Sequence, residues 1–343
     1  SNPLSTQDDV AAALVDAGVS VHAVRGEAHA DYYAAIDSVL DSAPELTMDD
    51  GCDLVSTLHL KRPGDVGRVV GGTEETTTGV IRLRAMEREG ALRYPVVAPG
   101  GTGTAQLFDN SHGTGQSALD GIIRSTNVLV AGRKVVVAGF GACGKGIARR
   151  ARGLGAEVVV TEVDPGRALE AALEGYRVEP MAAAAAEGDI FVTATGNSGV
   201  ITAEHFATMR DGAILANAGH FDVEIDVPGL EGASAGRRSV RPMLEEFQLP
   251  GERRVLLVAE GRVVNLGAAE GHPPAVMDIA FAAQVLALEW LVARRGELEA
   301  RVHLLPAGID DELAALKLAT MGLQIDRLTE AQAAYQRSWR AGT

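Results

Sequence analysis

The sequence predicts an α/β protein in which the second half of the chain forms a doubly wound parallel sheet. Three observations support this prediction. The length of 343 residues suggests two domains at roughly 150 residues each. Short apolar strands alternate with helices of about 10 to 15 residues, a pattern typical of βαβ units. A glycine-rich turn joins an apolar strand to a helix near residue 139.

The first half alternates between helices and strands. A capping run at residues 5–9 precedes an apolar stretch at 10–15, which predicts a helix at the start of the chain. Further expected elements are strands at 19–24, up to residue 51, and at 94–98, and helices at 30–40, 53–60 and 78–89. A long helix at 117–130 then serves as a spacer between the domains.

The second half has a clearer pattern. The expected order is a buried strand at 134–138, a glycine turn at 139–146, a helix at 147–153 and a strand at 157–161. Further elements follow at 168–174, 190–195, 205–209, 213–217 and 255–257. The alanine run 182–186 predicts a helix, because alanine has the highest helix propensity. The tail 328–343 is expected to be helical, and its Trp339 suggests contact with a partner surface.

Composition excludes several classes of partner. The formal charge of −15 argues against binding of nucleic acid or an anionic membrane, since both need clustered positive charge. Cys52 and Cys143 suggest neither a disulfide framework nor a metal site. We expect no apolar run to approach the roughly 20 residues that span a bilayer, and no basic and apolar leader at the start. We therefore expect a cytoplasmic enzyme without a metal, a nucleic-acid partner or a membrane partner.

Lysine is scarce in this chain. Of the 31 basic residues only four are lysines, namely Lys61, Lys134, Lys145 and Lys317. Arginine forms stable ion pairs but is a poor proton shuttle, because its pKa stays far above neutrality. Any mechanism that requires a lysine base therefore has four candidates.

The glycine turn has GxGxxG spacing at Gly139, Gly141 and Gly144, and Glu162 ends the next strand. In a dinucleotide site the first glycine makes the tight turn, the second admits the pyrophosphate and the third lets helix and strand approach. An acid at the end of the second strand accepts hydrogen bonds from the adenosine ribose and disfavours a 2′-phosphate. The turn therefore predicts a Rossmann-type domain that binds NAD.

Two other interpretations of the turn remain open at the level of sequence. Residues 139–145 also fit the phosphate-loop pattern GxxxxGK, but Gly146 stands where a serine or threonine would have to hold magnesium. A glycine-rich turn without a ligand is the remaining alternative.

Nine strings along the chain resemble S-adenosylhomocysteine hydrolase. They are NPLSTQDD (2–9), EETTTGV (74–80), FDN (108–110), GTGQS (113–117), TEVDP (161–165), GDIFVTATGN (188–197), GHFDVEID (219–226), LLVAEGRVVNL (256–266) and GHP (271–273). The resemblance implies a discontinuous, Rossmann-like substrate domain at 1–112 and 272–325, and an NAD domain at 116–270. It also implies a helical tail at 326–343 that contacts a neighbouring subunit in a homo-oligomer, a dimer or tetramer.

The resemblance implies a specific chemistry. In this family tightly bound NAD oxidises the 3′ hydroxyl of an adenine nucleoside, which acidifies the 4′ hydrogen and lets the 5′ substituent leave. Water then adds and the hydride returns, so NAD acts as a catalyst. The catalytic residues implied are Asp50, Glu75, Asp109, His220 and His272. Asp50 would be an acid-base group, and Glu75 and Asp109 would contact the sugar hydroxyls.

The resemblance also implies cofactor-binding residues besides the three glycines and Glu162. They are Thr76, Thr77, Thr78, Asn110, Asn197 and Asn265. For several of these residues a simpler interpretation exists. The threonines could cap the helix that follows them, and either histidine alone could be an ordinary hydrogen-bonded loop histidine.

The chain departs from the family in two places. The family has Asn-Asp-x-x-Thr-Lys before FDN, and its lysine helps to remove the 3′ hydroxyl proton. Here Gly100 and Gly101 replace the Asn-Asp pair, and Ala105 stands at the lysine position. His112 could take over as base or could be an exposed loop histidine. The chain also starts after the family's N-terminal Leu-His-Met-Thr element.

Three functions fit these observations. The first is the family's net reaction, hydrolysis of S-adenosylhomocysteine. The second is a nucleoside 5′-dehydratase that forms a 4′,5′-unsaturated adenine nucleoside in nucleoside-antibiotic biosynthesis, which the two departures motivate. The third is a catalytically silent NAD-binding paralogue. An ordinary hydroxyacid dehydrogenase would leave the strings EETTTGV and GHFD unexplained.

Overall fold

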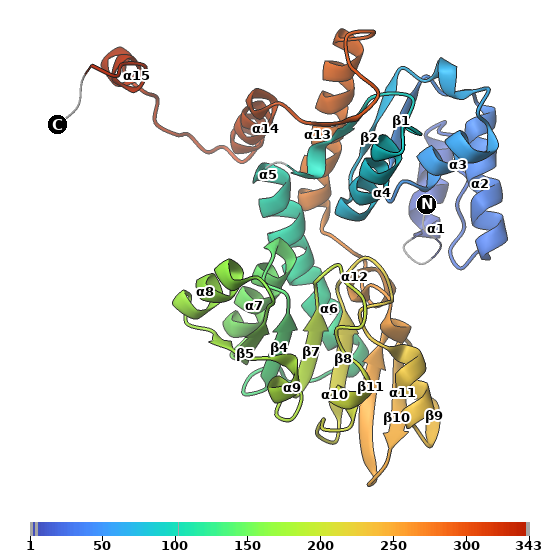
Figure 1. Cartoon of the computed structure of the whole chain (residues 1–343), viewed down its shortest axis with the longest axis vertical. Coiled ribbons are helices and arrows are strands. Elements are labelled where there is room, and N and C mark those ends of the chain that lie inside the picture. The colour runs from blue at the N-terminus through green and yellow to red at the C-terminus, as the bar shows by residue number, and fades with distance from the viewer. Residues whose placement is uncertain (1–2, 4–5, 102, 341–343) are drawn as a thin grey trace.

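The computed structural model describes residue 3 and residues 6–101 and 103–340. Two sheets lie in separate lobes, joined by the segment that runs into α6 (Gly115–Thr126) and by the segment that runs from α12 (Val264–Gly267) into α13 (Pro274–Ala293) (Figure 1). The predicted α/β class and the doubly wound second half are confirmed.

The first lobe contains a four-stranded parallel sheet in the order β1-β2-β3-β12. The strands are β1 (Leu46–Asp49), β2 (Gly71–Glu74), β3 (Val96–Ala98) and β12 (Val302–Leu304). The helices on this side of the molecule are α1 (Asp8–Asp16), α2 (His29–Asp41), α3 (Asp53–Lys61), α4 (Thr77–Arg88), α13 and α14 (Ala307–Thr320). Because β12 follows all strands of the other lobe, this sheet is discontinuous in sequence.

Alternate residues of the first sheet face two helix layers. Val96 of β3 packs with Leu58 of α3 and Leu83 of α4, whereas Val97 packs with Leu291 of α13. This alternation follows from the two-residue period of a strand, whose side chains point to opposite faces. The carboxyl ends of β1 and β2 therefore lie side by side between the two layers.

The second lobe contains an eight-stranded sheet in the order β6-β5-β4-β7-β8-β11-β10-β9. The strands are β4 (Lys134–Ala138), β5 (Glu157–Thr161), β6 (Arg177–Val178), β7 (Ile190–Thr193), β8 (Ala213–Asn217), β9 (Gly236–Arg241), β10 (Leu244–Leu249) and β11 (Arg253–Val258). The first six in this order are parallel, and β10 pairs antiparallel with both β11 and β9. The strand order reverses between β4 and β7, where doubly wound sheets bind ligands.

Helices flank both faces of the second sheet. They are α6, α7 (Ala142–Gly153), α8 (Pro165–Leu173), α9 (Met181–Ala184), α10 (Ala203–Phe206), α11 (Val227–Ala233) and α12. Val135 and Val137 of β4 pack into one cluster with Ile147 of α7, and Val136 packs into the opposite cluster with Phe206 of α10.

Short helical segments complete the chain. Single 3-10 turns lie at Val66–Arg68, Pro99–Gly101 and Ala259–Gly261, and α5 (Gly103–Ala105) leads into a π-helix at Gln106–Thr114. The last helix, α15 (Glu330–Gln336), lies away from both lobes in Figure 1. Within 328–340 the tail is thus helical only in part, and 341–343 lie outside the described residues. Trp339 is 88% exposed.

Some expected elements differ from the structure. Residues 19–24 form no strand, because no neighbouring strand pairs with them and most of their side chains face solvent. The helix after the glycine turn begins at Ala142 instead of residue 147, since the turn itself is shorter than expected. The alanine run contributes to the short α9, and the β9–β10 hairpin, β12, α13 and α14 were not anticipated.

The expectation about apolar runs was also wrong. One described helix, α13, is long and apolar enough to cross a membrane by length and composition. Asp278 and Glu289 interrupt the apolar run, so no continuous stretch of the sequence indicates a helix of this length. In the structure α13 packs against β2 and α14, and its buried residues include Ala287 and Leu291.

The π-helix and α6 are held tightly against α7. A Cβ added at Gly146 would overlap the backbone carbonyl of Ser111, and one at Gly115 would lie 2.6 Å from the carbonyl carbon of Gly146. Glycine at these positions lets the segment between the lobes approach the helix that follows the glycine turn.

This packing predicts unequal effects of alanine at two glycines of α7. Gly146→Ala should reduce the free energy of unfolding by about 1 to 3 kcal/mol, because the added methyl group meets backbone. Gly153→Ala is the matched control: nothing lies within 4 Å of its added Cβ. The control should be neutral or stabilising by up to about 1 kcal/mol. Chemical denaturation of both variants measures the difference, and equal stabilities would contradict the close packing.

Candidate active site

The glycine turn lies at the carboxyl end of β4, beside the point where the strand order reverses. Gly139 has φ +91°, and a Cβ there would lie 2.7 Å from the carbonyl oxygen of Ala194. A Cβ at Gly144 would overlap the carbonyl of Gly139, whereas the nearest atom to a Cβ at Gly141 is 3.7 Å away. Close packing against backbone thus requires glycine at the first and third positions, and the second glycine leaves room for a ligand at the start of α7.

Glu162 follows β5 and lies beside this turn. Its Oε2 accepts a hydrogen bond from Phe140 N at 2.7 Å, and its Oε1 accepts from Val163 N at 2.7 Å and Asp164 N at 3.0 Å. These backbone donors lower the pKa of Glu162 against the opposing effect of burial. A fixed negative charge next to the glycine turn suits a ribose with two free hydroxyls and repels a 2′-phosphate.

Two asparagines are predicted to bind the cofactor and lie close to the second lobe's core: Asn265 is within it, and Asn110 is beside α7. Asn265 of α12 is buried, and its Oδ1 has no hydrogen-bond partner among the described residues. Such an orphaned acceptor is costly unless a ligand satisfies it, so it fits a donor such as the nicotinamide amide. Asn110 lies on the π-helix and its Oδ1 accepts from Cys143 Sγ at 3.4 Å, which places it beside α7.

The third asparagine, Asn197, is exposed in the loop after β7. Glu224 holds this loop: its buried carboxylate accepts from Thr195 Oγ1 at 2.9 Å and from Gly196 N at 2.7 Å. Glu224 was not singled out from the sequence, although it lies inside the string GHFDVEID. Its partners lie 28 and 29 residues earlier in the chain, so only the fold reveals its role.

The threonines after β2 form the start of α4. Thr76 is the N-cap, and its Oγ1 accepts from Gly79 N at 3.1 Å. The capping interpretation therefore holds for Thr76. Thr77 is exposed and Thr78 is half-buried in the first turn of the helix.

Three carboxyl groups interact across the carboxyl ends of the first sheet and the π-helix. Burial, together with the nearby Asp109 and Asp50, raises the pKa of Glu75 to about 8, although a hydrogen bond with Gln284 of α13 opposes the rise. Asp50 remains accessible to solvent, yet desolvation by surrounding protein still raises its pKa, against the effect of His220. The cluster therefore holds one carboxyl that is protonated at neutral pH, which can donate a hydrogen bond.

His220 brings the second lobe to this cluster. It follows β8, and a Cβ on Gly51, next to Asp50, would lie 3.7 Å from its Nε2. Asn217 fixes the loop that carries it: Asn217 Oδ1 accepts from Gly219 N at 2.7 Å, and Nδ2 donates to Phe221 O at 2.7 Å. Groups from both lobes thus meet at one place.

His272 pairs with Asp109. Its Nδ1 lies 2.7 Å from Asp109 Oδ1, and its Nε2 lies 3.1 Å from the Thr114 hydroxyl. Since the carboxylate can only accept, Nδ1 carries the proton and Nε2 is left as the basic nitrogen. A carboxylate-oriented imidazole of this kind can accept a proton from a hydroxyl group.

No lysine reaches the cluster. The Lys134 Nζ lies 2.6 Å from Glu187, Lys145 Nζ lies 2.6 Å from Glu170 and Lys317 Nζ lies 2.8 Å from Asp278. Lys61 Nζ lies over the ring of Tyr33. His112 is exposed, with its Nδ1 3.4 Å from Arg150, so the histidine beside Asp109 is His272 instead.

Asp49 and Glu74, which were not predicted as functional residues, support this cluster. The Glu74 carboxylate is buried and accepts from the backbone of Gly51 and Cys52 at 2.8 and 2.9 Å and from the Thr76 hydroxyl at 2.8 Å. Asp49 accepts from Asp50 N at 3.0 Å, and burial raises its pKa to about 7. Each is the last residue of a strand and precedes a predicted site residue. The sequence alone does not distinguish such a position from that of an ordinary polar residue.

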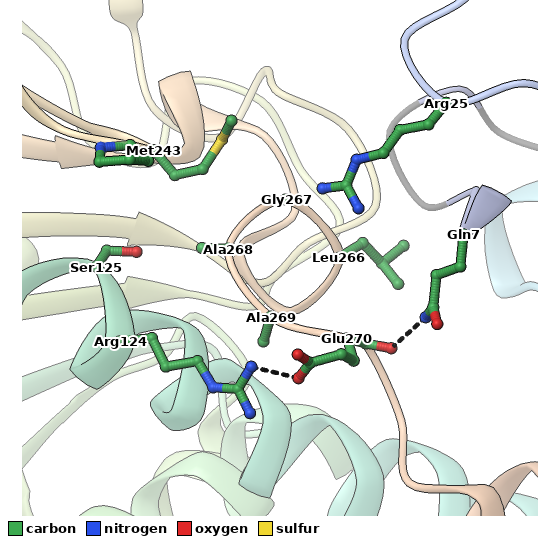
Figure 2. Close-up of a pocket in the computed structure, with 11 residues that line it drawn as sticks. Gln7, Arg25, Arg124, Ser125, Met243, Leu266, Gly267, Ala268, Ala269 and Glu270 are labelled. Carbon is green, nitrogen blue, oxygen red and sulfur yellow. Dashed lines mark hydrogen bonds and ion pairs between the residues drawn. The ribbon is translucent and has the colours of Figure 1, made fainter. Parts of the chain in front are cut away.

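A pocket lies elsewhere, where the segment after α12 meets α1 and α6 (Figure 2). Gln7 Nε2 donates to Glu270 O at 3.3 Å, and the Glu270 carboxylate pairs with Arg124 of α6. The guanidinium of Arg25 points into the pocket near Gly267 (Figure 2). These contacts connect the first lobe to the segment between the lobes, and none of the predicted catalytic residues lines the pocket.

Comparison with known proteins gives matches along the whole chain. The family model described as S-adenosyl-L-homocysteine hydrolase, NAD binding domain, matches residues 110–271, and the model described as S-adenosyl-L-homocysteine hydrolase matches residues 1–67. The adenosylhomocysteinase of Saccharolobus solfataricus is 56% identical over 344 residues, which cover 100% of this chain and 82% of that protein.

Two further relatives are similar to the same extent. The adenosylhomocysteinase of Thermosynechococcus vestitus is 54% identical, over 100% of this chain and 80% of its own length. The S-inosyl-L-homocysteine hydrolase of Methanopyrus kandleri is 54% identical, over 100% of this chain and 81% of its own length. With its glycine turn, its acidic partner and its orphaned asparagine fitting the cofactor, the chain therefore belongs to the S-adenosylhomocysteine hydrolase family of NAD-dependent enzymes.

Proposed function

We propose that this enzyme hydrolyses S-adenosylhomocysteine to adenosine and homocysteine. The observation that carries the proposal is the cluster of Asp50, Glu75, Asp109, His220 and His272, which gathers acids and bases from both lobes beside the NAD-binding turn. Bound NAD supplies the means to take a hydride from the sugar carbon that carries the 3′ hydroxyl. The residues of this chain must then move protons and hold the sugar.

His272 is the group best placed to accept the proton of the 3′ hydroxyl. Asp109 fixes its tautomer and would stabilise the imidazolium that forms, and Thr114 holds its basic nitrogen until substrate binds. This assignment supports activity in a chain with Ala105 at the family's lysine position, because the proton acceptor is supplied from the start of α13 instead.

The remaining groups divide between binding and proton transfer. Glu75, neutral at pH 7, would donate a hydrogen bond to a sugar hydroxyl. Asp50 is exposed and His220 lies close to the adjacent Gly51, so this pair would handle the protons at the 4′ and 5′ positions. Asn265 Oδ1, Glu162 and the three glycines would hold the cofactor, with Asn110, Asn197 and Thr76 to Thr78 around it.

Other expectations remain part of this proposal. The domain boundaries 1–112 with 272–325, 116–270 and 326–343, the homo-oligomeric state and the cytoplasmic location are predictions. The exposed Trp339 and the separation of α15 from the rest of the chain favour a subunit contact for the tail.

Incubation of the purified protein with S-adenosylhomocysteine tests the proposal. We expect release of free thiol together with adenosine, measured with a thiol reagent and by mass spectrometry. S-inosylhomocysteine should be assayed separately as an alternative substrate, because a relative named for it is 54% identical to this chain.

The same assay separates the alternatives. Loss of one water from an adenine nucleoside, without thiol release, would replace the hydrolase with the 5′-dehydratase. Absence of any product, from a folded protein that retains NAD, would favour the silent paralogue. Neither alternative has better support than the hydrolase from the comparisons or the cluster.

The proposed proton acceptor gives a prediction with a matched control. His272→Gln should reduce kcat by roughly 10²- to 10⁴-fold, the usual contribution of a general base. His112→Gln should leave kcat close to that of the parent enzyme, since the His112 ring is exposed and lies beside Arg150. Steady-state thiol release measures both variants. Equal rates for the two would show that His272 is not the base.

The raised pKa of Glu75 predicts a pH dependence of substrate binding. Below pH 8 the carboxyl is neutral and can donate a hydrogen bond; as pH rises through about 8 it becomes charged beside Asp50 and Asp109. KM should therefore increase above pH 8. Glu75→Gln keeps a neutral donor and should remove this increase. A Glu75→Gln enzyme whose KM still rises in the same pH range would contradict the assignment.

A further inference from the structure

The position of Asp50 depends on a loop with an unusual backbone. The loop joins β1 to α3, and two residues after Asp50 have left-handed conformations: Gly51 with φ +110° and Cys52 with φ +67°. A non-glycine residue such as Cys52 adopts this region only at a cost, so neighbouring groups must hold the loop in place.

Acidic side chains hold the N–H groups of this loop. Asp49 accepts from Asp50 N at 3.0 Å, and Glu74 accepts from Gly51 N at 2.8 Å and Cys52 N at 2.9 Å. Three successive amides are thus tied to two carboxyl groups that come from β1 and β2.

The guanidinium of Arg82 binds the carbonyl of the same loop. Arg82 Nη1 donates to the carbonyl oxygen of Gly51 and to Asp53 Oδ1, the latter at 2.7 Å. Its Nη2 donates to Ser56 Oγ at 3.1 Å. Arg82 therefore contacts the loop at the residue after Asp50 and again in the first two turns of α3.

Arg82 is carried by α4, the helix that begins just after Glu75 and Thr76. The same side chain that clamps the Asp50 loop is therefore fixed to the segment that carries Glu75. Glu75 N donates to the carbonyl oxygen of Asp49 at 3.1 Å, so the residue before Asp50 is hydrogen-bonded to Glu75 itself. The spacing of Asp50 and Glu75 depends on how α4 and the loop are joined.

We propose that Arg82 is a positioning residue that fixes Asp50 relative to Glu75. The inference rests on the proposed function, in which both carboxyl groups act on one nucleoside. Arginine suits the task because its planar fork can donate to a carbonyl, a carboxylate and a hydroxyl at once. Lysine carries the same charge, but its donors all lie on one nitrogen at the end of a flexible chain, so they do not match three separate acceptors.

Arg84 provides a matched control on the same helix. It pairs with Glu87 at 3.0 Å, and its side chain is about as exposed as that of Arg82, at 38% and 40%. Its ion pair stays within α4, and it is not part of the proposed site. Arg82→Met and Arg84→Met therefore remove the same charge and length from α4 at two different places.

The test compares kcat, KM, retained NAD and thermal melting of Arg82→Met, Arg82→Lys and Arg84→Met in the full chain. Arg82→Met should lose roughly 10- to 100-fold in kcat, because small misplacements of a reacting group have effects of this size. KM and retained NAD should change much less. Arg82→Lys should have an intermediate kcat, and Arg84→Met should resemble the parent enzyme.

Each outcome decides the inference. If Arg82→Met and Arg84→Met have the same kcat, Arg82 does not position Asp50. If Arg82→Met fails to fold, Arg82→Lys decides: a reduced kcat at parental melting temperature supports the inference, and a parental kcat overturns it. A parent enzyme that releases no thiol from S-adenosylhomocysteine would instead remove the proposed function, on which the inference rests.

Discussion

The buried carboxylate of Glu74 is the interaction on which the candidate site depends. It ends β2 and binds the backbone of the neighbouring β1 loop at Gly51 and Cys52, and also the Thr76 amide and hydroxyl that start α4. Desolvation raises its pKa, and these donors oppose the rise. A Cβ at Gly79 would overlap the Glu74 carboxyl, so a glycine is required in the first turn of α4. One buried acid thus places Asp50 and Glu75 together.

In the second lobe, too, buried polar side chains hold loops by hydrogen bonds to their backbone. Glu224 binds the loop after β7 through Thr195 and Gly196, and Asn217 binds the loop that carries His220 through Gly219 and Phe221. In both lobes a buried polar side chain near the carboxyl end of the sheet holds the loop of a neighbouring element. Buried polar groups that are fully hydrogen-bonded make loops rigid, which suits a site whose groups must meet from two lobes.

The sequence predicted local features better than distant ones. The glycine turn and Glu162 were recognisable because their spacing is set within one βαβ unit. The His272–Asp109 pair joins residues 163 positions apart, so its geometry appears only in the fold. The β9–β10 hairpin was missed because its strands contain arginines and glutamates that pair across the hairpin, such as Arg238 with Glu246 at 2.7 Å. Residues 19–24 show strand-like residues without a partner strand, and the structure leaves them irregular.

We propose that the His272–Asp109 pair allows oxidation of the 3′ hydroxyl in a chain whose four lysines all have other partners. Adding adenosine to the NAD-loaded protein tests this step alone, because oxidation at the 3′ position needs no leaving group. We expect the near-ultraviolet absorbance of bound NADH to appear in the parent enzyme and to be lost in His272→Gln. Bound adenosine with no reduction of NAD in the parent enzyme would contradict the proposal.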